Sequence, residues 1–124
     1  MMYDIGKKGE IAALKFYIQN GYEFVGKNYR SKYGEIDIIL KNAEYIVFSE
    51  VKTRNAIALV KPSESVDIRK RKRIIKTACE YLAENPTDLQ PRFDVTEVIY
   101  DADGHFFINN IENAFWQTDD YSAF

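Results

Sequence analysis

Hydrophobic residues recur along this chain with two different periods, and the change of period marks the predicted elements. Residues 5–20 place apolar side chains at roughly helical spacing, and Asn20-Gly21 supplies a stop signal at the end of this helix. Residues 22–30, 34–40 and 48–54 are rich in β-branched and aromatic side chains. The first half of the chain therefore predicts one helix followed by three strands.

The second half predicts one longer helix and two more strands. The helix is expected to begin with Ser65 as its N-cap and to end near Asn85-Pro86. Residues 92–100 and 105–111 alternate in character on either side of a turn, as a pair of strands does. Because the elements follow one another without a repeat or a linker, we expect residues 1–124 to form a single α/β domain with helices packed on a mixed sheet.

Two of the predicted strands carry acidic residues at positions where a buried strand normally has none. Asp37 is flanked by isoleucines, and Glu50 precedes Lys52 by two residues. Alternate residues of a strand point to one face and lie about 6.6 Å apart, so Glu50 and Lys52 are expected to face the same way. A carboxylate in a buried strand is unfavourable unless it is paired with a cation, and Asp37 therefore needs an explanation.

The register between these two strands can be worked out from the loop that joins them. The polar segment 41–44 predicts a hairpin, with either a two-residue loop at Ala43-Glu44 or a four-residue loop. Opposed residues share a face, so either loop leaves Asp37, Glu50 and Lys52 on one face, whereas a three-residue loop would separate them. Two carboxylates beside an ammonium can hold a divalent metal and position a water, which suits metal-dependent phosphodiester cleavage.

Composition and length exclude several classes of protein. The chain has 124 residues with 46% hydrophobic and 15% aromatic content, which is typical of a globular protein. Its one cysteine, Cys79, cannot form an intramolecular disulfide and fits a reducing compartment. We expect a cytoplasmic protein without a membrane segment, because no apolar run approaches the ~20 residues that span a bilayer. Without a glycine-rich loop of the Walker type, no nucleotide cofactor is expected.

The net charge of −2 conceals a strong asymmetry along the chain. Residues 1–76 hold 16 of the 17 basic side chains and only 9 of the 19 acidic ones, whereas residues 77–124 are strongly acidic. The basic half also contains the proposed site, which favours a polyanionic substrate such as DNA. The alternative is that folding mixes the two halves on one surface.

Basic residues around the predicted site are candidates for phosphate contacts, which position a nucleic acid without specifying its sequence. Five consecutive cations at 69–73 repel one another unless an acidic group is near, although such a run is usually a solvated helix face. Tyr29 and Tyr33 lie among these cations and are both candidates for stacking on unpaired bases, although core packing is the default expectation for Tyr29. The candidate phosphate contacts are Lys27, Arg30, Lys32, Arg54, Lys70, Arg71, Lys72 and Arg73.

Short motifs spread over nearly the whole chain resemble the YraN family. They are Gly6-Lys-Lys-Gly-Glu10, Asn28-Tyr-Arg30, Gly34-Glu-Ile-Asp37, Glu50-Val-Lys52, Arg92-Phe-Asp-Val95 and Asn113-Ala-Phe115. That family is a branch of the restriction-endonuclease-like, PD-(D/E)xK nuclease superfamily and is similar to archaeal Holliday junction resolvases. The resemblance implies a central mixed β-sheet flanked by helices, and a homodimer as in the resolvase branch. Two positions depart from the family pattern: Ser49, where a hydrophobic residue is usual, and Asn110, where histidine is frequent.

The resemblance also implies roles for individual residues. Asp37 matches the first metal-binding acid of the superfamily, Glu50 the second, and Lys52 the active-site lysine. Glu10 matches an acid on the first helix that approaches the metal in resolvase-like members. Mg²⁺ or Mn²⁺ is the expected cofactor, held by Asp37 and Glu50 with the backbone carbonyl of Val51, because magnesium favours oxygen ligands.

These observations lead to one principal hypothesis and two alternatives. The first is a metal-dependent endonuclease that acts on structured or branched DNA, with branched or single-stranded DNA as the expected partner. The second is a nucleic-acid-binding accessory protein that keeps the nuclease fold with little or no activity. The third is a protein-interaction domain whose acidic C-terminal portion contacts a basic partner. Salt separates the third from the others, because DNA affinity falls steeply as salt rises.

Overall fold

The computed structural model describes residues 5–56 and 67–115. Its elements are α1 (Ile5–Gln19), β1 (Glu23–Arg30), β2 (Glu35–Lys41), β3 (Tyr45–Asn55), α2 (Ile68–Glu84), β4 (Gln90–Tyr100) and β5 (Phe106–Phe115). The strands form one five-stranded sheet in the order β1-β2-β3-β4-β5, in which β3 and β4 are parallel and the other neighbours antiparallel. This α/β fold with a mixed sheet confirms the predicted class and is compatible with a restriction-endonuclease-like core.

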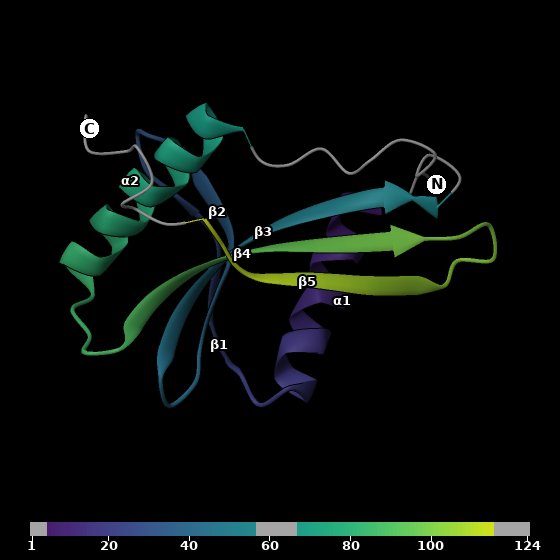
Figure 1. The fold of residues 1–124 in the computed structure, drawn as a ribbon, viewed down its shortest axis with the longest axis horizontal. Helices are drawn as coiled ribbons and strands as arrows, with labels where there is room; N and C mark the ends of the chain where they lie inside the picture. Colours follow the sequence, from purple (N-terminus) through teal and green to yellow (C-terminus); the bar gives the residue numbers. More distant parts are fainter. Residues whose placement is uncertain (1–4, 57–66, 116–124) are drawn as a thin grey trace.

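The two helices lie on opposite faces of the sheet (Figure 1). Ala13 and Tyr17 of α1 are buried against one face together with Val47 of β3. Ile75 of α2 is buried against the other face together with Phe48 of the same strand. Successive strand residues point to opposite faces, so β3 contributes to both cores and is the central strand of the fold.

The first helix is held unusually close to the sheet. A Cβ atom added at Gly9 would collide with the side chain of Thr53 on β3, so only glycine allows this approach. The helix ends as predicted, because the Asn20 amide donates to the carbonyl of Phe16 at 2.7 Å and Gly21 follows with a φ of +89°. The neighbour of Gly9, Glu10, lines a small cavity between α1 and the strands β1 and β2, together with Lys27 and Ile38.

The second helix begins two residues later than the sequence prediction. Asp67 is its N-cap, and the side chain accepts a hydrogen bond from the backbone N–H of Lys70 at 2.9 Å. Ser65, the predicted cap, lies outside the described residues. A carboxylate at this position also offsets the positive charge of the basic run that follows, which a serine hydroxyl cannot do. The helix ends at Asn85, as expected, with its backbone N–H bonded to the carbonyl of Tyr81.

The last strand is longer than predicted. The sequence suggested residues 105–111, whereas β5 runs from Phe106 to Phe115. Phe115, at the end of β5, stacks on Phe93 of β4 with the ring centres 5.3 Å apart. This contact stabilises the end of the strand, and the alternation of polar and apolar residues does not indicate it.

The hairpin between β2 and β3 adopts the shorter of the two predicted loops. Ile38 pairs with Ser49, and the ladder continues in register to Lys41 and Ile46. The N–H of Asn42 donates to the carbonyl of Tyr45, which leaves a two-residue loop between them. In this register Asp37 lies opposite Glu50, so the two acids share a face as the parity argument requires.

A buried network of polar side chains lies between α1 and the sheet. The Tyr17 hydroxyl donates to the Asp94 carboxylate at 2.8 Å and lies 3.0 Å from the hydroxyls of both Ser49 and Thr96. The Asn110 amide donates to the Tyr17 hydroxyl at 2.9 Å. Ser49 and Asn110, the two departures from the family pattern, therefore belong to one network. Burial and the Asp94 charge raise the pKa of Tyr17, which keeps the phenol protonated.

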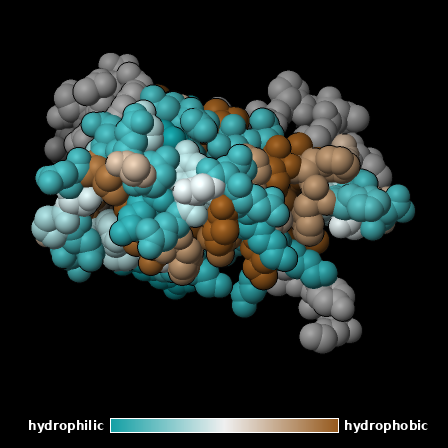
Figure 2. All heavy atoms as spheres, turned by 90° about the horizontal axis from the view of Figure 1, so that it is seen from below, coloured by the Kyte–Doolittle hydropathy of each residue, from teal (hydrophilic) through white to brown (hydrophobic). Residues whose placement is uncertain are grey.

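Exposed apolar side chains occur on α1 and β1, including Ile11, Ile18 and Phe24. On the side of the molecule seen from below, hydrophobic groups are interspersed with hydrophilic ones (Figure 2). Scattered apolar residues of this kind are normal on a protein surface and do not by themselves indicate a partner. No helix in the described ranges is long and apolar enough to span a membrane.

Candidate active site

The site begins where β2 and β3 separate. Their ladder ends at the pair of Ile38 and Ser49, and beyond it the Asp37 carboxylate accepts a hydrogen bond from the backbone N–H of Val51 at 2.7 Å. If the ladder continued, the Val51 N–H would donate to a backbone carbonyl of β2. Here it donates to the Asp37 side chain instead. On the other side of Asp37, Asn28 of β1 has a φ of +51°, so the sheet is distorted on both sides of this acid.

Asp37 and Glu50 form a close pair of carboxyl groups. Burial raises the pKa of Asp37 to about 7, and the charge of Glu50 adds to this effect. Only 7% of Glu50 is exposed. Glu10 of α1 raises the pKa of Asp37 further through its charge, so the structure brings this predicted residue within electrostatic reach of the pair. Asp37 and Glu50 line one cavity, whereas Glu10 lines a separate small cavity beside α1.

Lys70 enters the site from α2, which the sequence did not predict. Its ammonium lies 2.5 Å from the Glu50 carboxylate. Burial alone lowers the pKa of Lys70, but the hydrogen bond and charge of Glu50 outweigh it and raise that pKa. The sequence interpretation assigned Lys70 to the DNA backbone. A signal was nevertheless present, because a run of five cations requires an acidic neighbour, and Glu50 is that neighbour.

Lys52 and Val51 complete the part of the site that β3 contributes. Lys52 lies two residues beyond Glu50 on the same face of the strand and is half-buried. The N–H of Val51 points toward β2, where it meets Asp37. The carbonyl of a strand residue points to the same side as its N–H, so the Val51 carbonyl is also directed toward β2. Both residues thus lie where the sequence placed them relative to the acidic pair.

A cavity of about 400 Å³ gives access to this cluster. It is lined by both carboxylates, by Lys70 and by groups from β2 and α2. Glu35, another of its lining residues, pairs with Arg30 of β1 at 2.6 Å. Carboxylate oxygens that line an open cavity suit a hard divalent cation, which takes oxygen ligands and keeps several waters.

Four of the predicted phosphate-contact residues, Lys70 to Arg73, lie on α2. Arg73 lines the same cavity as the acidic pair. Lys72 follows Arg71 on α2, but the Arg71 guanidinium lies over the Phe115 ring at 5.7 Å, on another side of the helix. The run of five cations therefore does not form one face, and only part of it faces the carboxylates.

The other predicted contacts are distributed over both faces of the sheet. Lys27 lines a small cavity together with Glu10 of α1. Arg54 pairs with Glu97 of β4 at 3.2 Å. Arg30 is paired with Glu35, and Lys32 lies in the loop between β1 and β2. The structure therefore groups Lys32 and Arg30 with α2 but places Lys27 on the other side of the sheet.

A second cluster of potential ligands lies in the turn between β4 and β5. It consists of Asp101, Asp103 and His105. The Asp101 side chain accepts hydrogen bonds at 2.9 Å from the backbone N–H groups of both other residues, as in an Asx turn. Asp101 therefore has a structural role, because its side chain stabilises the turn. His105 is exposed, as expected.

Comparison with known proteins identifies relatives along most of the chain. Residues 9–98 match the model of a family described as Uncharacterised protein family UPF0102. A UPF0102 protein from Caldanaerobacter subterraneus subsp. tengcongensis is 40% identical over 114 residues, which cover 90% of this chain and 93% of the relative. A UPF0102 protein from Clostridium botulinum strain 657 is 42% identical over 115 residues, which cover 90% of this chain and 94% of the relative.

Proposed function

The chain belongs to the uncharacterised protein family UPF0102, also called the YraN family, and we propose that it is a metal-dependent endonuclease acting on structured or branched DNA. The observation that carries this proposal is the convergence of Asp37 and Glu50. Burial first and the charge of Glu50 second raise the pKa of Asp37, so two ionised carboxylates, which repel each other, are unfavourable in this place. A divalent cation between them would remove this repulsion, and the resident donors fit such an ion.

Asp37, Glu50 and the Val51 carbonyl would hold Mg²⁺ or Mn²⁺, with Glu10 as a further acid. All of these donors are oxygen atoms, which magnesium prefers, and it usually keeps several waters. When bound, the ion would polarise the scissile phosphate and lower the pKa of a coordinated water. The Val51 N–H fixes the Asp37 carboxylate through the hydrogen bond of 2.7 Å, so this ligand is oriented before any ion arrives.

Two lysines would act beside the acids in different ways. Lys52, on the face of Glu50, would orient the attacking water or stabilise negative charge on the phosphate in the transition state. Lys70 holds the Glu50 carboxylate. The positive charge of both lysines also favours the approach of a polyanion.

One observation favours the alternative of an accessory protein that binds nucleic acid with little or no activity. The contact of Lys70 with Glu50 already neutralises one of the two carboxylates. A protein in which this ion pair persisted would bind DNA through its cations and would not take up the metal.

A cleavage assay distinguishes these two functions. Labelled four-way junction, flap, duplex and single-stranded DNA are incubated with Mg²⁺ or Mn²⁺, and the Asp37→Asn/Glu50→Gln variant is purified in parallel. Glu35→Gln serves as the matched control, because Glu35 lines the same cavity but pairs with Arg30. The nuclease proposal expects cleavage by wild type and Glu35→Gln, and DNA binding without cleavage by the double variant. Cleavage by the double variant would refute the site, and intact binding without cleavage by wild type would favour the accessory protein.

A further inference from the structure

A line of cations on α2 leads away from the acidic pair. Lys70, Arg73 and Lys76 are spaced by three residues, so they follow one side of the helix over about 9 Å. Lys70 lies at the carboxylates, as described above. Lys76 lies at the other end, where its ammonium is 5.1 Å from the centre of the Tyr33 ring. The line therefore joins the candidate active site to an aromatic side chain.

Three adjoining cavities follow the same line. The first contains the acidic pair and shares Gly34, Glu35 and Arg73 with a second cavity of about 550 Å³. The second is formed by the loop between β1 and β2 against α2, and it shares Tyr33 with a third cavity of about 400 Å³ beside Lys76. Because neighbouring cavities share lining residues, they adjoin one another in a row along the helix, and we refer to this row as the depression.

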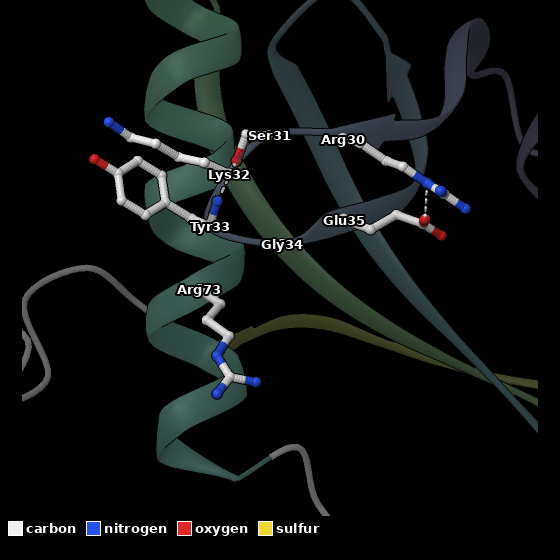
Figure 3. A pocket seen from close by; sticks show the side chains of 7 residues that line it. All are labelled: Arg30, Ser31, Lys32, Tyr33, Gly34, Glu35 and Arg73. Atoms are coloured by element: carbon white, nitrogen blue, oxygen red, sulfur yellow. Dashed lines mark hydrogen bonds and ion pairs between the residues drawn. The ribbon is translucent and has the colours of Figure 1, made fainter.

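The middle cavity is drawn in Figure 3. Tyr33 and Lys32 extend from one side of the loop, and Arg73 extends from α2 below it. Arg30 and Glu35 pair with each other on the opposite side (Figure 3). The middle cavity thus carries Lys32 and Arg73 beside Tyr33, and its acid Glu35 is paired with Arg30. The third cavity adds Lys76 together with one further acid, Glu80.

The loop that carries Tyr33 is fixed to the helix. The hydroxyl of Ser31 lies 3.1 Å from that of Thr77 on α2, which is fully buried. The backbone N–H of Tyr33 donates to the Ser31 hydroxyl at 3.0 Å, and the N–H of Ser31 donates to the carbonyl of Gly34 at 2.9 Å. A tethered loop presents its aromatic ring at little entropic cost on binding.

Tyr33 differs from the neighbouring tyrosine in its surroundings. The Tyr29 ring packs edge-on against Tyr81 at 5.2 Å, and its hydroxyl donates to Glu84, so Tyr29 is structural, as the sequence suggested. Tyr33 belongs to neither apolar cluster of the core. Its ring contacts are the ammonium groups of Lys32 at 5.2 Å and Lys76. An aromatic ring among cations is the combination that binds single-stranded nucleic acid.

We propose that this depression holds an unpaired strand of nucleic acid, with phosphates on Arg73 and Lys76 and a base stacked on Tyr33. The inference rests on the proposed function and deepens it, because it names an overhang or flap as the substrate class. A line of about 9 Å accommodates roughly two nucleotides. In a continuous duplex the bases stack on each other, so none of them is available to stack on Tyr33. The unpaired strand would run from Tyr33 toward the carboxylates.

Binding of oligonucleotides tests this proposal without any need for cleavage. The probes are a labelled single strand, a blunt duplex and the same duplex with a single-stranded tail, each as DNA and as RNA, in the absence of metal. Tyr33→Ala is expected to weaken binding of the single strand and the tailed duplex roughly ten-fold, and to leave the blunt duplex unchanged. Tyr33→Phe, which keeps the ring, should bind like wild type, and thermal unfolding confirms that each variant is folded.

The outcomes separate this inference from the nuclease proposal. Equal binding of the tailed duplex by wild type and Tyr33→Ala would refute the stacking site, even if the protein cleaved DNA. A ten-fold loss on the single strand and the tailed duplex, with the blunt duplex unchanged, would support it, even if no cleavage were found. Loss of the same size on the blunt duplex would overturn the assignment to an unpaired strand. A difference in affinity between the DNA and RNA probes would show which of the two nucleic acids the site prefers.

Discussion

The ammonium of Lys70 on α2 lies 2.5 Å from the carboxylate of Glu50 on β3. The two partners differ in exposure, because 49% of the lysine side chain is accessible but only 7% of the glutamate. The cation can therefore leave for solvent at little cost, whereas the acid cannot. A divalent metal at Asp37 and Glu50 would have to displace this ammonium, so the lysine and the metal are expected to compete for one carboxylate.

Replacing Lys70 tests this competition. Lys70→Met removes the internal cation and should strengthen Mn²⁺ binding several-fold in a calorimetric titration. The metal-free variant should lose about 1–2 kcal/mol of stability, because Glu50 is left in the partly buried site without its partner. Lys72→Met is the matched control, since it removes a charge from the same helix two residues away. Equal Mn²⁺ affinity of Lys70→Met and Lys72→Met would show that no such competition exists.

The raised pKa of Asp37 predicts how stability depends on pH in the absence of metal. The pKa of this carboxyl is 3.8 in the unfolded reference and about 7 in the fold, owing to burial and then to Glu50. The folded state therefore binds more protons in this window, and its stability falls as pH rises through it. Glu10 acts in the same direction as Glu50, whereas the nearby Lys70 opposes both.

Asp37→Asn should remove this pH dependence, because the amide carries no charge at any pH in the window. In EDTA we expect the variant to match wild type near pH 4 and to be more stable by on the order of 2–4 kcal/mol above pH 7. Urea unfolding at a series of pH values measures the difference. A constant difference between the two proteins from pH 4 to pH 8 would contradict the assigned shift.

The sequence predicted those parts of the site that depend only on the two-residue alternation of side chains along a strand. Asp37, Glu50 and Lys52 share a face because strand residues alternate and the hairpin loop is short, and both facts can be read from the chain. Lys70 depends instead on the angle at which α2 crosses the sheet, which no local pattern specifies. The basic run indicated only that an acid should be near.

The buried polar network was missed for a similar reason. Ser49 and Asn110 are far apart in the sequence and are joined through Tyr17, which a helical pattern assigns simply to an apolar core. In the sequence the two departures from the family pattern are unrelated, but in the structure both residues bond to the Tyr17 hydroxyl. The helices and strands could be predicted from the sequence, but the side-chain contacts between them could not.

Tyr17→Phe should destabilise the protein by about 1–3 kcal/mol, because Asp94 and the Asn110 amide would lose a buried partner. Tyr22→Phe is the control, since the Tyr22 hydroxyl only accepts from the Arg92 guanidinium, which keeps its two bonds to Asp94. Urea denaturation should therefore give a larger loss for Tyr17→Phe. Equal losses for the two variants would mean that the network contributes no more than a single hydrogen bond.

Arg54 distinguishes a structural role from a DNA contact. The sequence assigned it to phosphate, whereas in the fold its guanidinium lies 3.2 Å from Glu97, of which only 3% is exposed. Arg54→Met should cost about 2–4 kcal/mol, because an acid that remains buried loses its cationic partner. Arg54→Met/Glu97→Gln should recover much of this loss, since the buried charge is then absent. If instead Arg54→Met left stability unchanged while weakening DNA binding at every salt concentration, the arginine would be a phosphate contact and its pairing with Glu97 would contribute nothing to the fold.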